Sequence, residues 1–170
     1  MYDVIQVQTY HSPCGDLLLG SMDDKLCLCD WLDRRNRKRV DNRLHRLLRA
    51  VYKKQISDVQ VEAIRQLDEY FKHERTKFDV PLLLVGTEFQ ERVWMALQEI
   101  PYGETCTYGE LSRRLGSAEA VRAVAGANGA NAISIFVPCH RVIGSNHAMI
   151  GYAGGVEAKK FLLDLEQSFR

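Results

Sequence analysis

The sequence has no apolar run that approaches the roughly 20 residues needed to cross a bilayer. Its first residues also lack the basic stretch and the apolar stretch of a secretory signal. Both absences lead us to expect a cytoplasmic protein that makes no contact with a membrane.

An excess of charge of one sign is missing too. The chain has 23 basic and 22 acidic residues, which gives a formal net charge of +1. A protein that attracts nucleic acid through its overall field is usually far more basic. Any contact with DNA must therefore come from a local surface. With 46% hydrophobic residues, the composition is that of an ordinary globular protein.

Cysteine is present, but not in the spacing of a disulfide framework or of a zinc site. The chain has 5 cysteines, an odd number, and no two of them have CxxC spacing. Cys27 and Cys29 are expected to lie in a strand. The sequence therefore predicts free thiols and no bound metal.

The N-terminal half, which we define as residues 1–84, predicts a small antiparallel sheet followed by two helices. Short apolar runs are separated by the turn sequences 12–15 and 23–24. Two stripes with helical spacing follow, and a break at 79–81 is expected to end the second helix and begin a linker. The stripes are Leu44, Leu47, Leu48 and Val51, then Ile64, Leu67 and Phe71.

Basic residues crowd positions 34–54 of this half. Such a run is usually a solvated loop and helix face. The alternative is that it makes auxiliary contacts to DNA phosphates. In that case, neutralising Arg34, Arg35, Arg37 and Lys38 reduces the salt dependence of DNA binding, whereas an unchanged salt slope rejects the alternative.

The C-terminal half, residues 85–170, is predicted to be mostly helical. Thr87 and Gln90 have the spacing of a capping box ahead of an apolar helix face. Short helices at 107–115 and 118–127 predict a helix-turn-helix, although any pair of antiparallel helices would give the same pattern. A buried strand is expected at 133–137. The chain ends in an amphipathic helix whose apolar face carries Ala158, Phe161, Leu162 and Leu165.

Chemically distinctive residues follow the predicted strand, in the string Pro138-Cys139-His140-Arg141. A thiol becomes a strong nucleophile once a nearby base or positive charge favours the thiolate. These residue types therefore suit nucleophilic catalysis. On residue chemistry alone, however, a buried cysteine beside a strand is more often a small hydrophobic residue.

A longer string decides between these interpretations. Residues 138–144, followed by 151–156 and the helix end at 163–166, resemble the O6-alkylguanine-DNA alkyltransferases, in particular the bacterial single-polypeptide type. Further matching stretches lie at 89–94, 101–105 and 121–128. The resemblance implies an α/β (α+β) fold with a ribonuclease H-like N-terminal sheet and a helix-turn-helix domain that carries the active site.

The resemblance also implies a role for each matching residue. Cys139 would accept the alkyl group, His140 would remove the thiol proton through a water molecule, and Glu166 would orient the imidazole. Asn131 would tie the helix-turn-helix to the active-site segment. Tyr108 would donate a hydrogen bond toward N3 of guanine and make it a better leaving group.

DNA contacts follow from the same resemblance. A buried thiol cannot reach a base inside a duplex, so the nucleotide must flip out through the minor groove. Arg122 would fill the gap that it leaves, while Tyr108, Gly109 and Ala123 would contact the DNA. An alanine-rich helix can instead be one that packs tightly inside a protein. The base pocket would be formed by Val142, Tyr152, Ala153 and Gly154, with an alanine where some relatives carry a hydroxyl residue.

The implied activity is a single irreversible transfer from O6-alkylguanine, and from O4-methylthymine, by a monomer that uses no metal or cofactor. Two other functions are compatible with parts of the sequence. A damage sensor of the same fold would lack the acceptor cysteine, whereas Cys139 is present. A cysteine hydrolase would need a glycine-rich oxyanion turn before the cysteine, and none precedes it.

Overall fold

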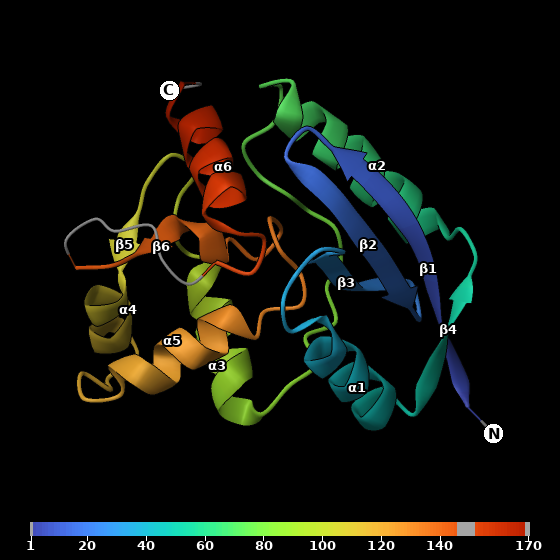
Figure 1. Ribbon diagram of the computed structural model, residues 1–170, viewed down its shortest axis with the longest axis horizontal. Helices are drawn as coiled ribbons and strands as arrows, with labels where there is room; N and C mark the ends of the chain where they lie inside the picture. The colour runs from blue at the N-terminus through green and yellow to red at the C-terminus, as the bar shows by residue number, and fades with distance from the viewer. Residues whose placement is uncertain (1, 146–151, 169–170) are drawn as a thin grey trace.

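The computed structural model describes residues 2–145 and 152–168 and places the two halves of the chain side by side (Figure 1). In the N-terminal half, β1 (Asp3–Ser12), β2 (Gly15–Met22) and β3 (Lys25–Trp31) form an antiparallel meander. The predicted antiparallel sheet is therefore confirmed. A further strand, β4 (Ala50–Lys54), pairs with β1 in parallel, so the order is β3-β2-β1-β4.

Two helices pack beside this sheet, as the apolar stripes predict. Helix α1 spans Arg37–Leu48 and α2 spans Asp58–Phe71. The prediction that Val51 belongs to the first helix is wrong. Arg49 adopts a left-handed conformation with φ of 50°, which ends α1 and turns the chain into β4, where Val51 is 45% exposed.

Helix α2 begins at a capping box that the sequence analysis did not identify. The Ser57 hydroxyl accepts from the Gln60 amide, and the Gln60 side chain accepts from the Ser57 amide. The helix ends at Phe71, well before the predicted break at 79–81. The connection to the C-terminal half is therefore longer than expected.

The free edge of β3 joins the two halves. Leu26 in β3 exchanges backbone hydrogen bonds with Pro81 and Leu83 of the connection. Cys29 donates to the Ala132 carbonyl at 2.8 Å and accepts from the Ser134 amide at 2.8 Å. Because the second pair lies just before the Pro138-Cys139 string, the sheet fixes the backbone that leads to the candidate nucleophile.

The C-terminal half contains four helices and a short parallel pair of strands among its described residues. The predicted capping box of Thr87 and Gln90 is confirmed by reciprocal hydrogen bonds of 3.0 and 3.1 Å. The elements are α3 (Glu88–Leu97), β5 (Cys106–Thr107), α4 (Tyr108–Arg114), α5 (Val121–Gly129), the 3-10 helix η1 (Cys139–Arg141), β6 (Val142–Ile143) and α6 (Val156–Ser168).

Two predictions for this half need correction. The strand expected at 133–137 is a tight turn with isolated bridges, in which Ile133 pairs with Cys29 and Ser134 with Val137. Ile135 has φ of 74° in this turn, a conformation incompatible with a continuous strand. The second helix of the pair begins at Val121 instead of position 118. Residues 133–137 are nevertheless buried, as expected.

Across residues 2–145 and 152–168, no helix combines the length and apolar character needed to cross a membrane. In the same ranges, no group of three or more histidine, cysteine, aspartate or glutamate side chains is arranged to hold a metal ion.

Candidate active site

Glu166, on α6, is the most heavily hydrogen-bonded carboxylate of the candidate site. Its Oε2 atom accepts from His140 Nε2 at 2.7 Å, from the Tyr70 hydroxyl at 2.6 Å and from Arg141 Nη2 at 3.1 Å. Its Oε1 atom accepts from Arg141 Nε at 2.9 Å and from the Gly103 amide at 3.2 Å. Burial alone would raise the pKa of Glu166, but the interactions with His140 and Arg141 hold it well below its usual value.

The contact with Glu166 also sets the chemistry of His140. A carboxylate can only accept, so the His140 Nε2 atom must carry the proton, and Nδ1 of the neutral ring is then a base. Nδ1 is buried and has no hydrogen-bond partner among the residues that the structure describes. Burial lowers the pKa of His140 although Glu166 opposes this effect, so the ring is neutral and able to accept a proton.

The Cys139 thiol begins η1 and is 2% exposed. Burial raises its pKa, because the thiolate is poorly solvated there. The Asn131 amide, the Lys159 ammonium and the Arg34 guanidinium lower the pKa in part. The thiol is therefore protonated at rest, and it needs a base such as His140 to become a nucleophile.

Asn131 links the end of α5 to the nucleophile, as the resemblance implies. Its Nδ2 atom donates to the Val137 carbonyl at 2.9 Å and to Cys139 Sγ at 3.2 Å, and its Oδ1 atom accepts from the Ile133 amide at 2.9 Å. One buried side chain thus fixes the turn at 133–137 and contacts the sulfur. Its neighbour Asn128 donates to the Cys139 carbonyl at 3.5 Å.

Lys159 is a buried cation that the sequence analysis did not single out. Its Nζ atom donates to the Val142 carbonyl at 2.5 Å, and its charge lowers the pKa of Cys139. Lys159 and Glu166 are seven positions apart, which places them on one face of α6. A lysine within the apolar stripe was the signal available in the sequence.

The loop expected to form the base pocket rests on the N-terminal sheet. The Trp31 indole donates to the Tyr152 hydroxyl at 3.2 Å, and the two rings meet edge-on with centroids 6.0 Å apart. A Cβ atom at Gly154 would lie 2.6 Å from the same indole, so only glycine allows this approach. Ala153 lines a pocket of about 340 Å³ together with Arg34 and Tyr152. Residues 146–151, which precede this stretch in sequence, lie outside the described residues.

The predicted DNA-contacting residues lie on α4 and α5. Arg122, Ala123 and Gly126 are exposed, while Val124, Ala127 and Asn128 are buried. Helix α5 therefore packs against the protein along one face. Its exposed face carries mostly small side chains and one arginine. Tyr108 and Gly109 begin α4 and are half-buried. Burial raises the pKa of Tyr108, and the nearby Cys139 adds to this effect.

The basic segment at 34–54 is largely structural at the positions where phosphate contacts were suspected. Arg34 and Arg37 both pair with the buried Asp30, at 2.9 and 2.5 Å. Arg34 also donates to the Gly129 carbonyl at 2.7 Å, directly beside the active-site segment. Of the four residues chosen for neutralisation, only Arg35 and Lys38 are exposed and free of these structural contacts. The exposed basic residues later in the segment keep the hypothesis of phosphate contact open; they are Arg39, Arg46, Arg49, Lys53 and Lys54.

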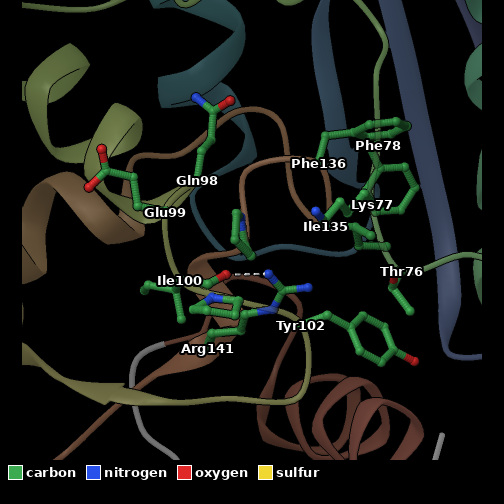
Figure 2. Close-up of a pocket in the computed structure, with 12 residues that line it drawn as sticks. Thr76, Lys77, Phe78, Gln98, Glu99, Ile100, Tyr102, Ile135, Phe136 and Arg141 are labelled. Atoms are coloured by element: carbon green, nitrogen blue, oxygen red, sulfur yellow. Dashed lines mark hydrogen bonds between the residues drawn. The ribbon is translucent and has the colours of Figure 1, made fainter. Parts of the chain in front are cut away.

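A separate pocket of about 420 Å³ is lined in part by Pro138 and Arg141, which flank Cys139 and His140 in sequence. Figure 2 shows Arg141 in its wall, donating to the Ile100 carbonyl at 2.6 Å. Neither Cys139 nor His140 lines this pocket. It is therefore distinct from the candidate reaction site.

The structure brings Asn131 to Cys139, and it brings Glu166 of α6 to His140, the residue next to that cysteine. Sequence reasoning missed the groups that support them. Arg141 follows Cys139 by two positions, but its ion pair with Glu166 could not be inferred from the spacing of residues in the sequence. Nothing in the sequence distinguished Tyr70 from other apolar residues of α2, and the same holds for Trp31 in β3.

Comparisons with known proteins agree with this geometry. Residues 88–168 match the family model described as "6-O-methylguanine DNA methyltransferase, DNA binding domain", and residues 5–84 match the model of its "ribonuclease-like domain". The chain belongs to the 6-O-methylguanine DNA methyltransferase family.

Relatives of this methyltransferase family span nearly the whole chain. A constitutive methylated-DNA–protein-cysteine methyltransferase of Bacillus subtilis is 42% identical, over 94% of this chain and 93% of its own. A methylated-DNA–protein-cysteine methyltransferase of Methanosarcina barkeri is 41% identical, over 98% and 97%. The crystal structure of Mycobacterium tuberculosis OGT in complex with DNA is 42% identical and has a TM-score of 0.82, covering 98% of this chain and 94% of that one.

Proposed function

We propose that this protein repairs duplex DNA by transferring the alkyl group of O6-alkylguanine, and the methyl group of O4-methylthymine, to its own Cys139. The observation that carries the proposal is a buried thiol, held at 3.2 Å by Asn131, next in sequence to a histidine that a buried carboxylate orients. Membership of the methyltransferase family and a DNA-bound structural relative support it.

The proposed transfer is a single displacement. His140 Nδ1 takes the thiol proton through a water molecule, and Glu166 stabilises the imidazolium that forms. The Sγ–carbon bond forms as the bond from carbon to O6 breaks, and the electron pair passes to guanine. Tyr108 donates toward N3 and stabilises the leaving base. The product is a thioether. None of the described residues around Cys139 is placed to cleave it, so each molecule reacts once.

Base recognition in this proposal uses Val142, Tyr152, Ala153 and Gly154, whose backbone groups can approach the flipped base. In this proposal the chain has two functional units. Residues 1–84 support the site, whereas residues 85–170 bind DNA and contain the reacting cysteine. We also propose that the protein acts as a monomer in the cytoplasm, where it can reach DNA. One thiol and one pocket on the same chain are sufficient for the chemistry.

The direct test is the intact mass of the protein after incubation with a duplex that carries one O6-methylguanine. We expect a gain of one methyl group per chain and repair that stops at one equivalent of DNA. Repair that continues beyond one equivalent would favour a turnover enzyme. Folded, reduced protein that gains no mass would indicate a module that only binds the lesion.

Arg122 is expected to stabilise the extrahelical nucleotide from the exposed face of α5. The Arg122→Ala variant should react with a duplex about 10 to 100 times more slowly, because flipping costs a few kcal/mol. With an unpaired strand the loss should be much smaller. Single-turnover rates on the two substrates measure this difference.

The matched control for this prediction is Arg113→Ala, which removes an exposed arginine from the neighbouring helix α4. It should affect both substrates to a similar extent. Equal losses on duplex and single strand for Arg122→Ala would contradict its proposed role in flipping.

A further inference from the structure

The Glu166 carboxylate receives a hydrogen bond from the N-terminal half of the chain. Tyr70, near the end of α2, has no exposed surface, and its hydroxyl donates to Glu166 Oε2 at 2.6 Å. The same oxygen accepts from His140 Nε2 at 2.7 Å. A residue 96 positions away in sequence from Glu166 thus contacts the very atom that orients the base.

The tyrosine ring is held in place by other aromatic rings. Its centroid lies 5.2 Å from Phe71, 5.4 Å from Phe78 and 6.1 Å from Tyr102. Rings packed at these distances have little freedom to rotate. The direction of the Tyr70 hydroxyl is therefore set by the fold, as a positioning contact requires.

We propose that Tyr70 is a positioning residue for alkyl transfer, supplied by the N-terminal half, whose hydroxyl fixes the Glu166 carboxylate against His140 and takes up part of its negative charge. This inference rests on the proposed function, since it concerns the base of that reaction. It gives the N-terminal half a part in the chemistry in addition to its structural contacts.

The electrostatic consequence depends on every charged or titratable group that faces this pair. Glu166 is faced by Tyr70 from α2, Tyr102 from the turn after α3 and Arg141 from η1. His140 is faced by Glu166 and also by Arg141 and Lys159, whose positive charges disfavour its protonation. Tyr70 and His140 make the two shortest hydrogen bonds to Glu166 Oε2. Arg141 keeps the carboxylate ionised whether or not the tyrosine is present.

Removing the Tyr70 hydroxyl should therefore leave more of the negative charge of Glu166 to interact with His140. Its imidazolium becomes more stable, and the pKa of His140 rises. The neutral ring that must accept the thiol proton is then populated only at higher pH. The acidic limb of the plot of transfer rate against pH should move to higher pH. Transfer at mildly acidic pH should therefore slow.

The experiment is the single-turnover transfer rate of the full-length Tyr70→Phe variant against pH, with an O6-methylguanine duplex. We expect the acidic midpoint to rise by about 0.5 to 1 pH unit. This is a fraction of what a whole hydrogen bond to a charged group contributes, because the Tyr70 bond is present in both protonation states of His140. A profile identical to that of the unmodified protein would overturn the proposal, whatever happens to stability.

The matched control is Tyr10→Phe. The Tyr10 hydroxyl donates to Asp68 Oδ1 at 2.7 Å, so this variant removes the same kind of bond from the same helix, away from His140. It should lose stability without a change in the pH profile. An equal shift in both variants would show that the effect comes from α2 as a whole and would overturn the specific role of Tyr70.

A second substitution covers the case in which Tyr70→Phe does not fold. A ring-fluorinated tyrosine placed at position 70 keeps the shape but makes the hydroxyl a stronger donor, so the acidic midpoint should fall; an unchanged midpoint would contradict the proposal. Failure of the proposed function itself would look different. In that case the unmodified protein would gain no methyl group at any pH.

Discussion

The Cys139→Ser variant is expected to lose alkyl acceptance while it still binds O6-methylguanine DNA. Serine keeps an acceptor for the Asn131 amide, which lies 3.2 Å from the sulfur, so the pocket should retain its shape. A hydroxyl, however, is far harder to deprotonate than a thiol, and His140 is not a strong enough base to do so. We expect the transfer rate to fall roughly a thousandfold or more.

Two measurements separate chemistry from binding in this variant: intact mass after incubation with the modified duplex, and the Kd for the same duplex. The matched control is Cys106→Ser, which alters another buried thiol of the C-terminal half. It should still gain one methyl group. Methyl transfer by Cys139→Ser at a rate near that of the unmodified protein would refute the assignment of the acceptor.

The second large effect is expected for Glu166→Ala, which should destabilise the fold and stop transfer together. The substitution leaves the buried Arg141 guanidinium without its counter-charge and removes the acceptor for His140, Tyr70 and Gly103. Breaking one partner of a buried pair typically costs about 3 to 5 kcal/mol. Transfer should fail in the fraction that folds, because nothing stabilises the imidazolium.

Urea unfolding measures the first effect, and the single-turnover rate measures the second. Glu62→Ala is the contrast, since Glu62 pairs with Arg65 on the surface, where solvent screens the charges. Its effect on stability should be far smaller, and transfer should be unchanged. Glu166→Gln should preserve more of the fold than Glu166→Ala yet still transfer slowly. Similar stability losses for Glu62→Ala and Glu166→Ala would contradict the predicted importance of the buried network.

Local sequence patterns predicted those helices whose capping residues and apolar stripes lie within the helix itself. Thr87 and Gln90 marked the beginning of α3, and the stripe with Ile64 and Leu67 marked α2, because capping and amphipathic spacing act within a few residues. The prediction for Val51 failed because the stripe continued past the residue that ends α1. The left-handed conformation of Arg49 leaves no comparable trace in the sequence.

The prediction of a strand at 133–137 was wrong for a different reason. Its apolar residues indicated burial, which was correct, but a strand needs a partner along its length. The segment pairs with β3 at Cys29 only, and the strained φ of Ile135 ends the pairing. Whether such a run becomes a strand depends on neighbours that are distant in sequence.

By itself, the sequence predicted a two-part organisation, most of the helices and a candidate nucleophile, because Pro138-Cys139-His140-Arg141 is a contiguous string. Only the tertiary structure decided which groups lie around that candidate nucleophile. Glu166 lies 26 positions from His140, and Tyr70 lies 96 positions from Glu166. Their hydrogen bonds exist because α2, η1 and α6 meet in one buried place, where a carboxylate is stable only when several donors surround it.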